Sequence, residues 1–264
     1  MSEYIREPNP ADDKYSRGVV GFVTSSEEFP GAALLGITAA MRAGVGMVRY
    51  LGPQHVANLV LLSRPETVLQ DGRAQSWVVG SGVPADNSEQ AARIRKLAKE
   101  KTLLVVDAGA LQIIDFTNCA AKCVLTPHAG EAAGLLTSLG DSISRSEVEA
   151  DPIAAALLIA KLTGQLTVLK GNQTVIAQGT KTFQFDPAPT VLATAGSGDV
   201  LAGIIGALLA GNAEDILSGD AELFDVVKAA ISLQVKAATL AARETTVVAL
   251  DIAEAVGRVV AAGK

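Results

Sequence analysis

The segment TAGSGD at residues 194–199 runs directly into the apolar segment VLAGIIG at residues 200–206. Small residues allow a tight turn that brings backbone amides close to a ligand. We expect a helix over Asp199–Leu209, whose positive end would point at the turn. Gly196, Ser197 and Gly198 would then bind a phosphate or a developing negative charge. Asp199 could act there as a general base, or it could simply cap the helix.

Outward from this turn, short apolar runs alternate with Ala-rich helical runs. This alternation predicts an α/β fold with a mostly parallel central sheet and helices on both faces. No long linker or repeat interrupts the chain, so we expect one domain over residues 1–264. The expected strands are Val19–Val23, Val45–Leu51, Trp77–Val79, Leu103–Val106, Val124–Leu125, Thr167–Leu169 and Thr174–Ala177. The expected helices are Pro30–Ala43, Ser88–Lys101, Asp199–Leu209, Phe224–Arg243 and Ile252–Ala262.

Four polar residues, Asp107, His128, Lys170 and Asp199, follow strand-like or turn segments. Ligands of open α/β sheets bind beyond the carboxyl ends of the strands. We therefore expect these chain-distant segments to converge on one crevice.

Two of these segments carry further polar groups. Lys170-Gly171-Asn172-Gln173-Thr174 could hold a phosphate through Lys170 and a ribose or base edge through its amides and hydroxyl, or it could be a plain hairpin turn. In the segment 126–131, His128 could bind a ligand and Glu131 could hold Mg²⁺ directly or through water. The alternative for that segment is an ordinary helix start. The other histidine, His55, is interpreted as a surface residue.

The segment Gly80–Ala85 fits the pattern G-x-G-x-x-A after a strand, with Asp107 near the place of a ribose-binding acid. Pro84 and the polar residues after it should delay the next helix, whereas a dinucleotide-binding turn needs the helix to begin among the glycines. We therefore interpret the segment as a ligand-facing turn. The sequence also lacks the G-x-x-x-x-G-K-[ST] pattern of a P-loop.

Composition narrows the class of protein further. With 22 basic and 28 acidic residues the net charge is −6, which argues against nucleic acid or an anionic membrane as a partner. The N-terminus is charged and has no apolar signal region, so a cytoplasmic location is expected. Cys119 and Cys123 have no histidine pair nearby and are expected to be buried or half-buried thiols.

Taken together, the sequence resembles the ADP- or ATP-dependent NAD(P)H-hydrate dehydratases, which have a ribokinase-like fold. The resemblance spans residues 29 to 206, in the family's order. The matching segments are Phe29–Leu35 with Ala40–Gly46, Val78–Gly82, Val106–Leu111, Thr126–Glu131, Lys170–Thr174 and Ala195–Gly203. The segment at Thr24-Ser25-Ser26 is a loose version of the family's glycine-serine turn.

The resemblance implies a role for each matching position. Gly196, Ser197 and Gly198 would form the anion hole for the transferred phosphoryl group, and Asp199 would deprotonate the substrate hydroxyl. Residues 170–174, together with Gly198, would hold ADP or ATP. The hydrated nicotinamide nucleotide would be lined by Ala32, Gly82, His128 and Asp199. Glu131 stands where ribokinase-like enzymes often have a metal-linked acid.

The implied activity is nucleotide-dependent dehydration of hydrated NADH and NADPH, with Mg²⁺ and ADP or ATP required, and ADP favoured among stand-alone bacterial relatives. Relatives also suggest a homo-oligomer, with a tetramer as one expected state. Many relatives carry an added epimerase domain, which the residues before the first strand cannot encode. Three alternatives stay open: a small-molecule kinase of the same fold, a non-catalytic nucleotide-binding regulator, and an NAD-dependent redox enzyme.

Overall fold

The structure, a computed structural model, describes residues 4–243 and 245–263. Its centre is an eight-stranded sheet in the order β2-β1-β3-β4-β5-β6-β7-β8. The pairs from β2 through β6 are parallel, and β7 and β8 add an antiparallel hairpin at one edge. The expected mostly parallel sheet is therefore confirmed.

The strands are β1 (Val19–Val23), β2 (Met47–Tyr50), β3 (Ser76–Val79), β4 (Leu103–Val106), β5 (Lys122–Leu125), β6 (Leu166–Leu169), β7 (Val175–Gln178) and β8 (Lys181–Gln184). The longer helices are α1 (Gly31–Arg42), α2 (Gln54–Ser63), α3 (Ser88–Ala98), α5 (Ala129–Ser138), α7 (Pro152–Thr163), α8 (Ser197–Gly211), α10 (Leu223–Ala241) and α11 (Ala249–Ala262). The short helices are α4 (Ala110–Ile113), α6 (Arg145–Ala150) and α9 (Ala213–Ser218), with 3-10 turns η1 (Phe116–Asn118) and η2 (Thr190–Leu192).

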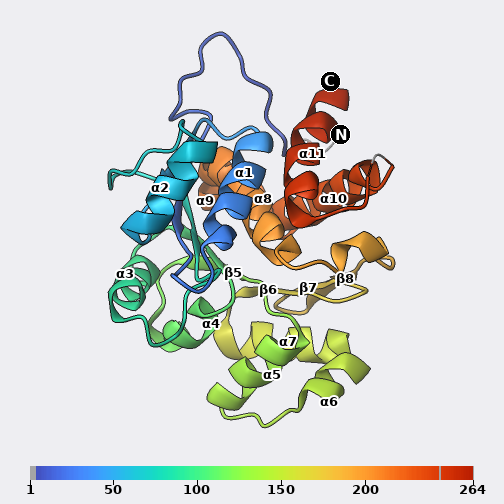
Figure 1. Cartoon of the computed structure of the whole chain (residues 1–264). Helices are drawn as coiled ribbons and strands as arrows, with labels where there is room; N and C mark the ends of the chain where they lie inside the picture. The colour runs from blue at the N-terminus through green and yellow to red at the C-terminus, as the bar shows by residue number, and fades with distance from the viewer. Residues whose placement is uncertain (1–3, 244, 264) are drawn as a thin grey trace.

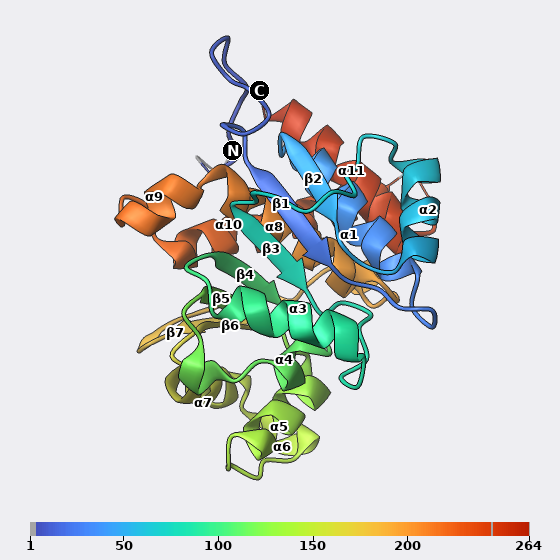
Figure 2. The same ribbon diagram turned by 90° about the vertical axis from the view of Figure 1, so that its left-hand side faces the viewer.

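Helices cover both faces of the sheet, as Figures 1 and 2 show. One hydrophobic core lies between the sheet and the layer of α1, α8, α10 and α11. A second core lies between the opposite face and the layer of α3, α4, α5 and α7. Strands β1 to β4 and β6 are buried along their whole length, and their side chains are mostly apolar, as is typical of parallel sheets covered on both faces.

Each predicted strand and helix has a counterpart, within a few residues at its ends. The sequence did not predict helices α2, α4, α6, α7 and α9 or strand β8, whereas the helix start that was the alternative for residues 126–131 is present as α5. Strand β8 is largely exposed and polar, so it lacks the apolar run that marks the buried strands. Helix α7 has a clear start, since Asp151 accepts a hydrogen bond from the Ala154 amide and Pro152 occupies the first turn. None of the described helices has the length and apolar character that a membrane crossing requires.

Side-chain burial agrees with two smaller expectations. Cys123 is buried and Cys119 is half-buried. His55 lies exposed on α2. Neither the two cysteines nor His55 is therefore assigned a role in ligand binding.

Helix α8 runs between α1 and the sheet, and its packing depends on glycines. A Cβ added at Gly203 would overlap the backbone carbonyl of Gly36 on α1. A Cβ at Gly206 would collide with the side chain of Val78 on β3. Backbone groups cannot yield as a flexible side chain can, so the two helices approach this closely only because Gly203 has no side chain. This contact fixes where the first turn of α8 lies.

We expect Gly203→Ala to lower the free energy of unfolding by roughly 1–3 kcal/mol, the usual cost of overpacking a core. The matched control is Gly134→Ala on α5, where the nearest atom to an added Cβ is 3.5 Å away. The control should be neutral or stabilise by about 0.5–1 kcal/mol, because Ala is the better helix former. Urea denaturation of both variants measures the difference. Equal stabilities for the two would show that the α1–α8 contact is not restrictive.

Candidate active site

The glycine turn before α8 presents unpaired backbone amides. Gly196 precedes the helix in a left-handed conformation, with φ of 89°. The amides of Gly198 and Asp199 have no hydrogen-bond partner among the described residues, as expected for a first helical turn. The Ser197 hydroxyl donates to the Leu192 carbonyl at 2.8 Å, so this side chain holds the turn in place. The turn is therefore a preformed site for an anion.

Two cavities meet at Gly196. The first, of about 610 Å³, is mainly apolar and is lined by Phe29, Pro30, Ala32, Leu35, Gly82, Val83, Ala108 and Asp199, among others. The second, of about 520 Å³, is lined by residues 170–172, Thr174, residues 188–190 and the turn itself, among others. Volumes of this size suit small-molecule ligands. The arrangement provides two adjoining binding sites with the glycine turn between them.

Asp199 lies at the junction and is not a helix cap. It is the third residue of α8, and no side chain caps this helix. Among the described residues, no side chain forms a hydrogen bond or an ion pair with its carboxylate, and Gly196 lies close to its Oδ2. Burial, together with the charges of Asp107 and Glu131, raises the pKa of Asp199 from 3.8 to about 7, against the opposing charge of Lys170. A carboxylate with a pKa near neutrality is suited to accept a proton.

Lys170 and Asp107 form a largely buried ion pair at the second cavity. The Lys170 ammonium lies 2.8 Å from Oδ1 of Asp107 and 3.8 Å from Oε2 of Glu131. Burial raises the pKa of Asp107, but the Lys170 charge and the hydrogen bonds from Lys170, Thr126 and Ser81 together outweigh it, so the pKa is lowered overall. Burial lowers the pKa of Lys170, but the Asp107, Glu131 and Asp199 carboxylates together outweigh it, so the pKa is raised overall. Both groups are therefore charged at neutral pH.

His128 and Glu131 form a capping box at the start of α5. Nδ1 of His128 accepts hydrogen bonds from the Gly130 and Glu131 amides at 3.0 and 3.1 Å, which places the ring proton on Nε2. Oε2 of Glu131 accepts from the His128 amide at 2.8 Å. The backbone amide of Lys170 donates to the Pro127 carbonyl, so this helix start and Lys170 are held together.

The residues of the crevice fit Mg²⁺ only as a partner of bound phosphates. The described residues contain no group of three or more His, Cys, Asp or Glu side chains arranged to hold a metal. Glu131 offers a single carboxylate beside the second cavity. Mg²⁺ commonly keeps several waters and is bound by one or two carboxylates together with substrate phosphates. Glu131 would fill such a role, and the nucleotide would supply the remaining oxygen ligands.

Most of the residues predicted from sequence meet in this crevice. Ala32, Gly82 and Asp199 line the first cavity. The second cavity is lined by Lys170, Gly171, Asn172, Thr174, Gly196, Ser197 and Gly198, and also by His128. Gln173 is exposed and is not among the residues that line either cavity.

Gln234 on α10 also belongs to the crevice, although it was not predicted from the sequence. Its Nε2 donates to the Ser197 carbonyl at 2.7 Å, and its side chain is buried beside the second cavity. No motif marks it, because it lies in a helix far along the chain from the turn. The buried face of α10 was its only available signal.

The turn after β3 follows the interpretation made from sequence. Helix α3 begins only at Ser88, where Asn87 caps it, so the glycines do not open a helix. Gly82 faces the first cavity with φ of +66°, and Ser81 turns its hydroxyl to Asp107 at 2.9 Å. Asp107 is thus engaged in a buried network of its own.

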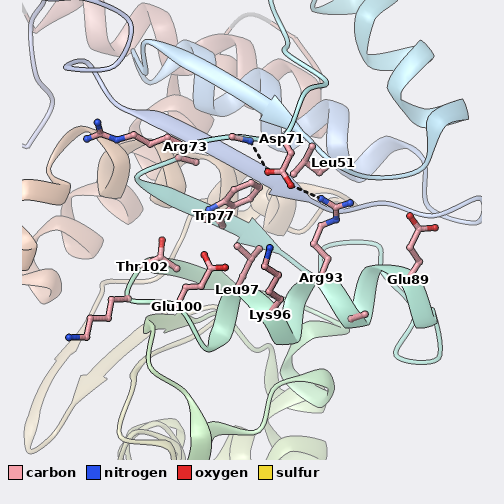
Figure 3. Close-up of a pocket in the computed structure, with 14 residues that line it drawn as sticks. Leu51, Asp71, Arg73, Trp77, Glu89, Arg93, Lys96, Leu97, Glu100 and Thr102 are labelled. Carbon is pink, nitrogen blue, oxygen red and sulfur yellow. Dashed lines mark hydrogen bonds and ion pairs between the residues drawn. The ribbon is translucent and has the colours of Figure 1, made fainter.

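A third cavity, of about 600 Å³, lies away from the crevice (Figure 3). It runs between α3 and the segment before β3, and the Asp71–Arg93 ion pair spans it at 3.3 Å. Trp77 forms part of its wall and covers Gly21 of β1, where an added Cβ would collide with the indole. None of the sequence-predicted site residues lines this cavity.

With this geometry in hand, comparison with known proteins identifies the family. Residues 20–258 match the family described as NAD(P)H-hydrate dehydratase. The chain belongs to the NAD(P)H-hydrate dehydratase family. An ADP-dependent (S)-NAD(P)H-hydrate dehydratase of Xanthomonas campestris is 33% identical over 75% of this chain and 74% of its own length.

Two further proteins, a bifunctional relative and a solved structure, are similar to this chain over most of its length. A bifunctional NAD(P)H-hydrate repair enzyme of Corynebacterium glutamicum is 36% identical over 90% of this chain, which spans only 45% of that protein. The crystal structure of the Bacillus subtilis ADP/ATP-dependent NAD(P)H-hydrate dehydratase, co-crystallized with ATP/Mg²⁺, superposes with a TM-score of 0.84 at 24% identity. That superposition covers 98% of this chain and 94% of the other. The expected ribokinase-like fold is confirmed.

The raised pKa of Asp199 predicts a pH-dependent gain in stability for Asp199→Asn. The folded state keeps the proton up to about pH 7, whereas the unfolded chain loses it near pH 3.8. The stability contributed by this residue is therefore present below pH 3.8 and is lost as pH rises to 7. At pH 8 the Asn variant should be more stable than the wild type by roughly 1–3 kcal/mol, and at pH 4 the difference should be far smaller. Thermal unfolding at the two pH values measures it, and an equal effect at both would contradict the pKa.

Proposed function

We propose that this chain restores NADH and NADPH from their hydrated forms, using ADP or ATP to activate the hydroxyl as a phosphate ester. The observation that carries the proposal is the pair of cavities meeting at the glycine turn, with a near-neutral carboxylate at their junction. Two substrates must approach each other for phosphoryl transfer, and this arrangement provides a place for each. Family membership agrees with this reaction.

The first cavity suits the hydrated nicotinamide, and the second suits the nucleotide. The first has apolar walls from Phe29, Leu35 and Val83, with Asp199 as its acidic group. The second offers the Lys170 ammonium and the amides of the glycine turn for phosphates, and apolar residues such as Leu192 for a base. His128, predicted to contact the hydrated nicotinamide, lies on the nucleotide side of the junction and would meet that substrate where the two ligands adjoin.

The reaction needs one base and stabilisation of charge. Asp199 takes the proton of the substrate hydroxyl, whose oxygen attacks the terminal phosphorus of the nucleotide. The bond from that phosphorus to the bridging oxygen breaks and releases AMP from ADP, or ADP from ATP. The ring nitrogen's electron pair then expels phosphate, and loss of a proton from the adjacent ring carbon restores the double bond.

This chain's residues supply positioning and preorganised charge for these steps. During transfer, the phosphoryl oxygens accept hydrogen bonds from the amides of Gly198 and Asp199 and from the Lys170 ammonium. Mg²⁺, carried with the nucleotide and close to Glu131, would neutralise phosphate charge when bound. No covalent nucleophile from the protein is required.

We propose further that residues 1–264 act as one domain, that the enzyme is cytoplasmic, and that it assembles as a homo-oligomer, with a tetramer as the first state to test. The continuous sheet supports the single domain. Intracellular coenzymes as substrates support the location. The proposed binding partners are small molecules, namely the hydrated coenzymes and ADP or ATP. We do not propose nucleic acid or membranes as partners.

Absorbance at the NADH band tests the proposed reaction. Purified protein, Mg²⁺ and hydrated NADH should regain the band only when ADP or ATP is added, with one phosphate released for each NADH formed. The nucleotide that gives the higher kcat/KM is the physiological candidate. A nucleotide-dependent phosphorylated product that accumulates without NADH would instead identify a small-molecule kinase of the same fold.

Removing the base should abolish most turnover while leaving nucleotide binding intact. We expect Asp199→Asn to lower kcat by roughly 10²–10⁴-fold, the usual contribution of a general base. Calorimetric titration with ADP should give a Kd close to that of the wild type. A variant that turns over at nearly the wild-type rate would rule out Asp199 as the base, and a variant that no longer binds ADP would reassign it to nucleotide binding.

A further inference from the structure

The Lys170 ammonium occupies an electrostatically unfavourable place. A Cβ added at Gly198 would lie 3.3 Å from Nζ of Lys170, so the ammonium sits directly beside the first turn of α8. Helix N-termini carry partial positive charge and repel cations. The unpaired carboxylate of Asp199 is on the same turn and would attract the ammonium. Nevertheless, the ion pairs that Lys170 forms with described residues are to Asp107 and Glu131, and none of them is to Asp199.

Asp107 is held firmly enough to anchor this cation. Oδ1 accepts hydrogen bonds from Lys170 and from the Thr126 hydroxyl, both at 2.8 Å. Oδ2 accepts from the Ser81 hydroxyl at 2.9 Å. Asp107 is only 3% exposed, and Ser81 and Thr126 are buried as well. The carboxylate therefore joins the ends of β3, β5 and β6 to its own strand, β4.

The backbone around Asp107 is also constrained. Ala108, the next residue, adopts φ of +45°, a left-handed conformation that residues with a side chain rarely adopt. The carbonyl of Asp107 fills the space where a Cβ of Gly80 would lie, and Gly80 has φ of +99°. Such strained positions persist only when the surrounding structure holds them, and they cluster at functional sites.

We infer that Asp107 is a positioning residue, which fixes the Lys170 ammonium over the glycine turn and so prevents it from pairing with Asp199. The inference rests on the proposed function of the crevice. Lys170 then remains available to the phosphoryl group, and Asp199 remains available to the substrate hydroxyl. Asp107 itself lines neither cavity and acts through Lys170, which lines the second.

The charges around Asp199 define what loss of Asp107 should do. Asp107 follows β4, Lys170 follows β6 and Glu131 lies on α5, and each affects the pKa of Asp199. Glu28 lies at the same cavity. From α1 and α11, the residues that approach the turn are the apolar Leu35 and Ala249. Removing the Asp107 charge, and freeing Lys170 to approach Asp199, would both lower the pKa of Asp199.

The test compares Asp107→Asn with the wild type. Asn keeps the shape and one acceptor oxygen, but it cannot hold the ammonium by charge. We expect the pKa of Asp199 to fall below about 6, read from ¹³C carboxyl NMR of aspartate-labelled protein, with the resonance assigned by its loss in Asp199→Asn. We expect kcat to fall at least tenfold, while the Kd for ADP changes less than threefold. The acidic limb of the pH–rate profile should move to lower pH.

Glu254→Gln is the matched control. Glu254 on α11 forms ion pairs with Arg42 and Arg64, away from the crevice. This variant should leave kcat and the pKa of Asp199 unchanged. An unmoved Asp199 pKa in folded Asp107→Asn, or a loss confined to ADP affinity, would overturn the inference.

A double variant settles the case in which Asp107→Asn does not fold. Lys170→Met removes the cation, and adding Asp107→Asn removes its now unpaired partner, which should restore stability. If Asp107 acts through Lys170, the double variant should match Lys170→Met in kcat within twofold. A further multiplicative loss would overturn the inference. The NMR titration needs no substrate, so it tests the role of Asp107 even if the wild type forms no NADH. Failure to form NADH would refute the proposed function alone.

Discussion

The close backbone contact between Gly203 on α8 and Gly36 on α1 determines where the crevice forms. It lets α8 lie against α1 and the sheet at the same time, which brings the first turn of α8 to the carboxyl ends of the strands. The amides of that turn can face a ligand only from this position. Everything that the crevice does with anions follows from this helix placement.

The crevice combines opposing electrostatic demands in a small volume. Asp199 is partly withdrawn from water and has no hydrogen-bond partner among the described residues, which favours its neutral form and makes it a stronger base once ionised. In the same crevice, Lys170 and Asp107 are both kept charged by each other. Similar side chains thus have different protonation behaviour because one is paired and the other is not.

Local sequence predicted much of this architecture. Apolar runs such as Leu103–Val106 mark buried strands, and their order with helices indicates the parallel sheet. Because parallel strands end at the same edge, the convergence of His128, Lys170 and Asp199 also followed from the sequence. Strand β8 escaped prediction because it is exposed and polar, and its place depends on pairing with β7.

The less predictable parts are contacts between distant segments. Asp107 and Lys170 are separated by 63 positions, and the hydrogen bond from Gln234 to Ser197 spans 37. No spacing rule relates such residues. Their pairing is decided by which strands become neighbours and by the helix that packs over them, and both are properties of the completed fold.

The single tryptophan has a practical consequence for work on this protein. Trp77 is 5% exposed, covers Gly21 on the sheet face opposite α8, and borders the cavity away from the crevice. Its indole loses this shielded environment only when β1, β3 and α3 separate. Intrinsic fluorescence excited at the indole band therefore follows unfolding of the central sheet and is largely blind to events at the glycine turn.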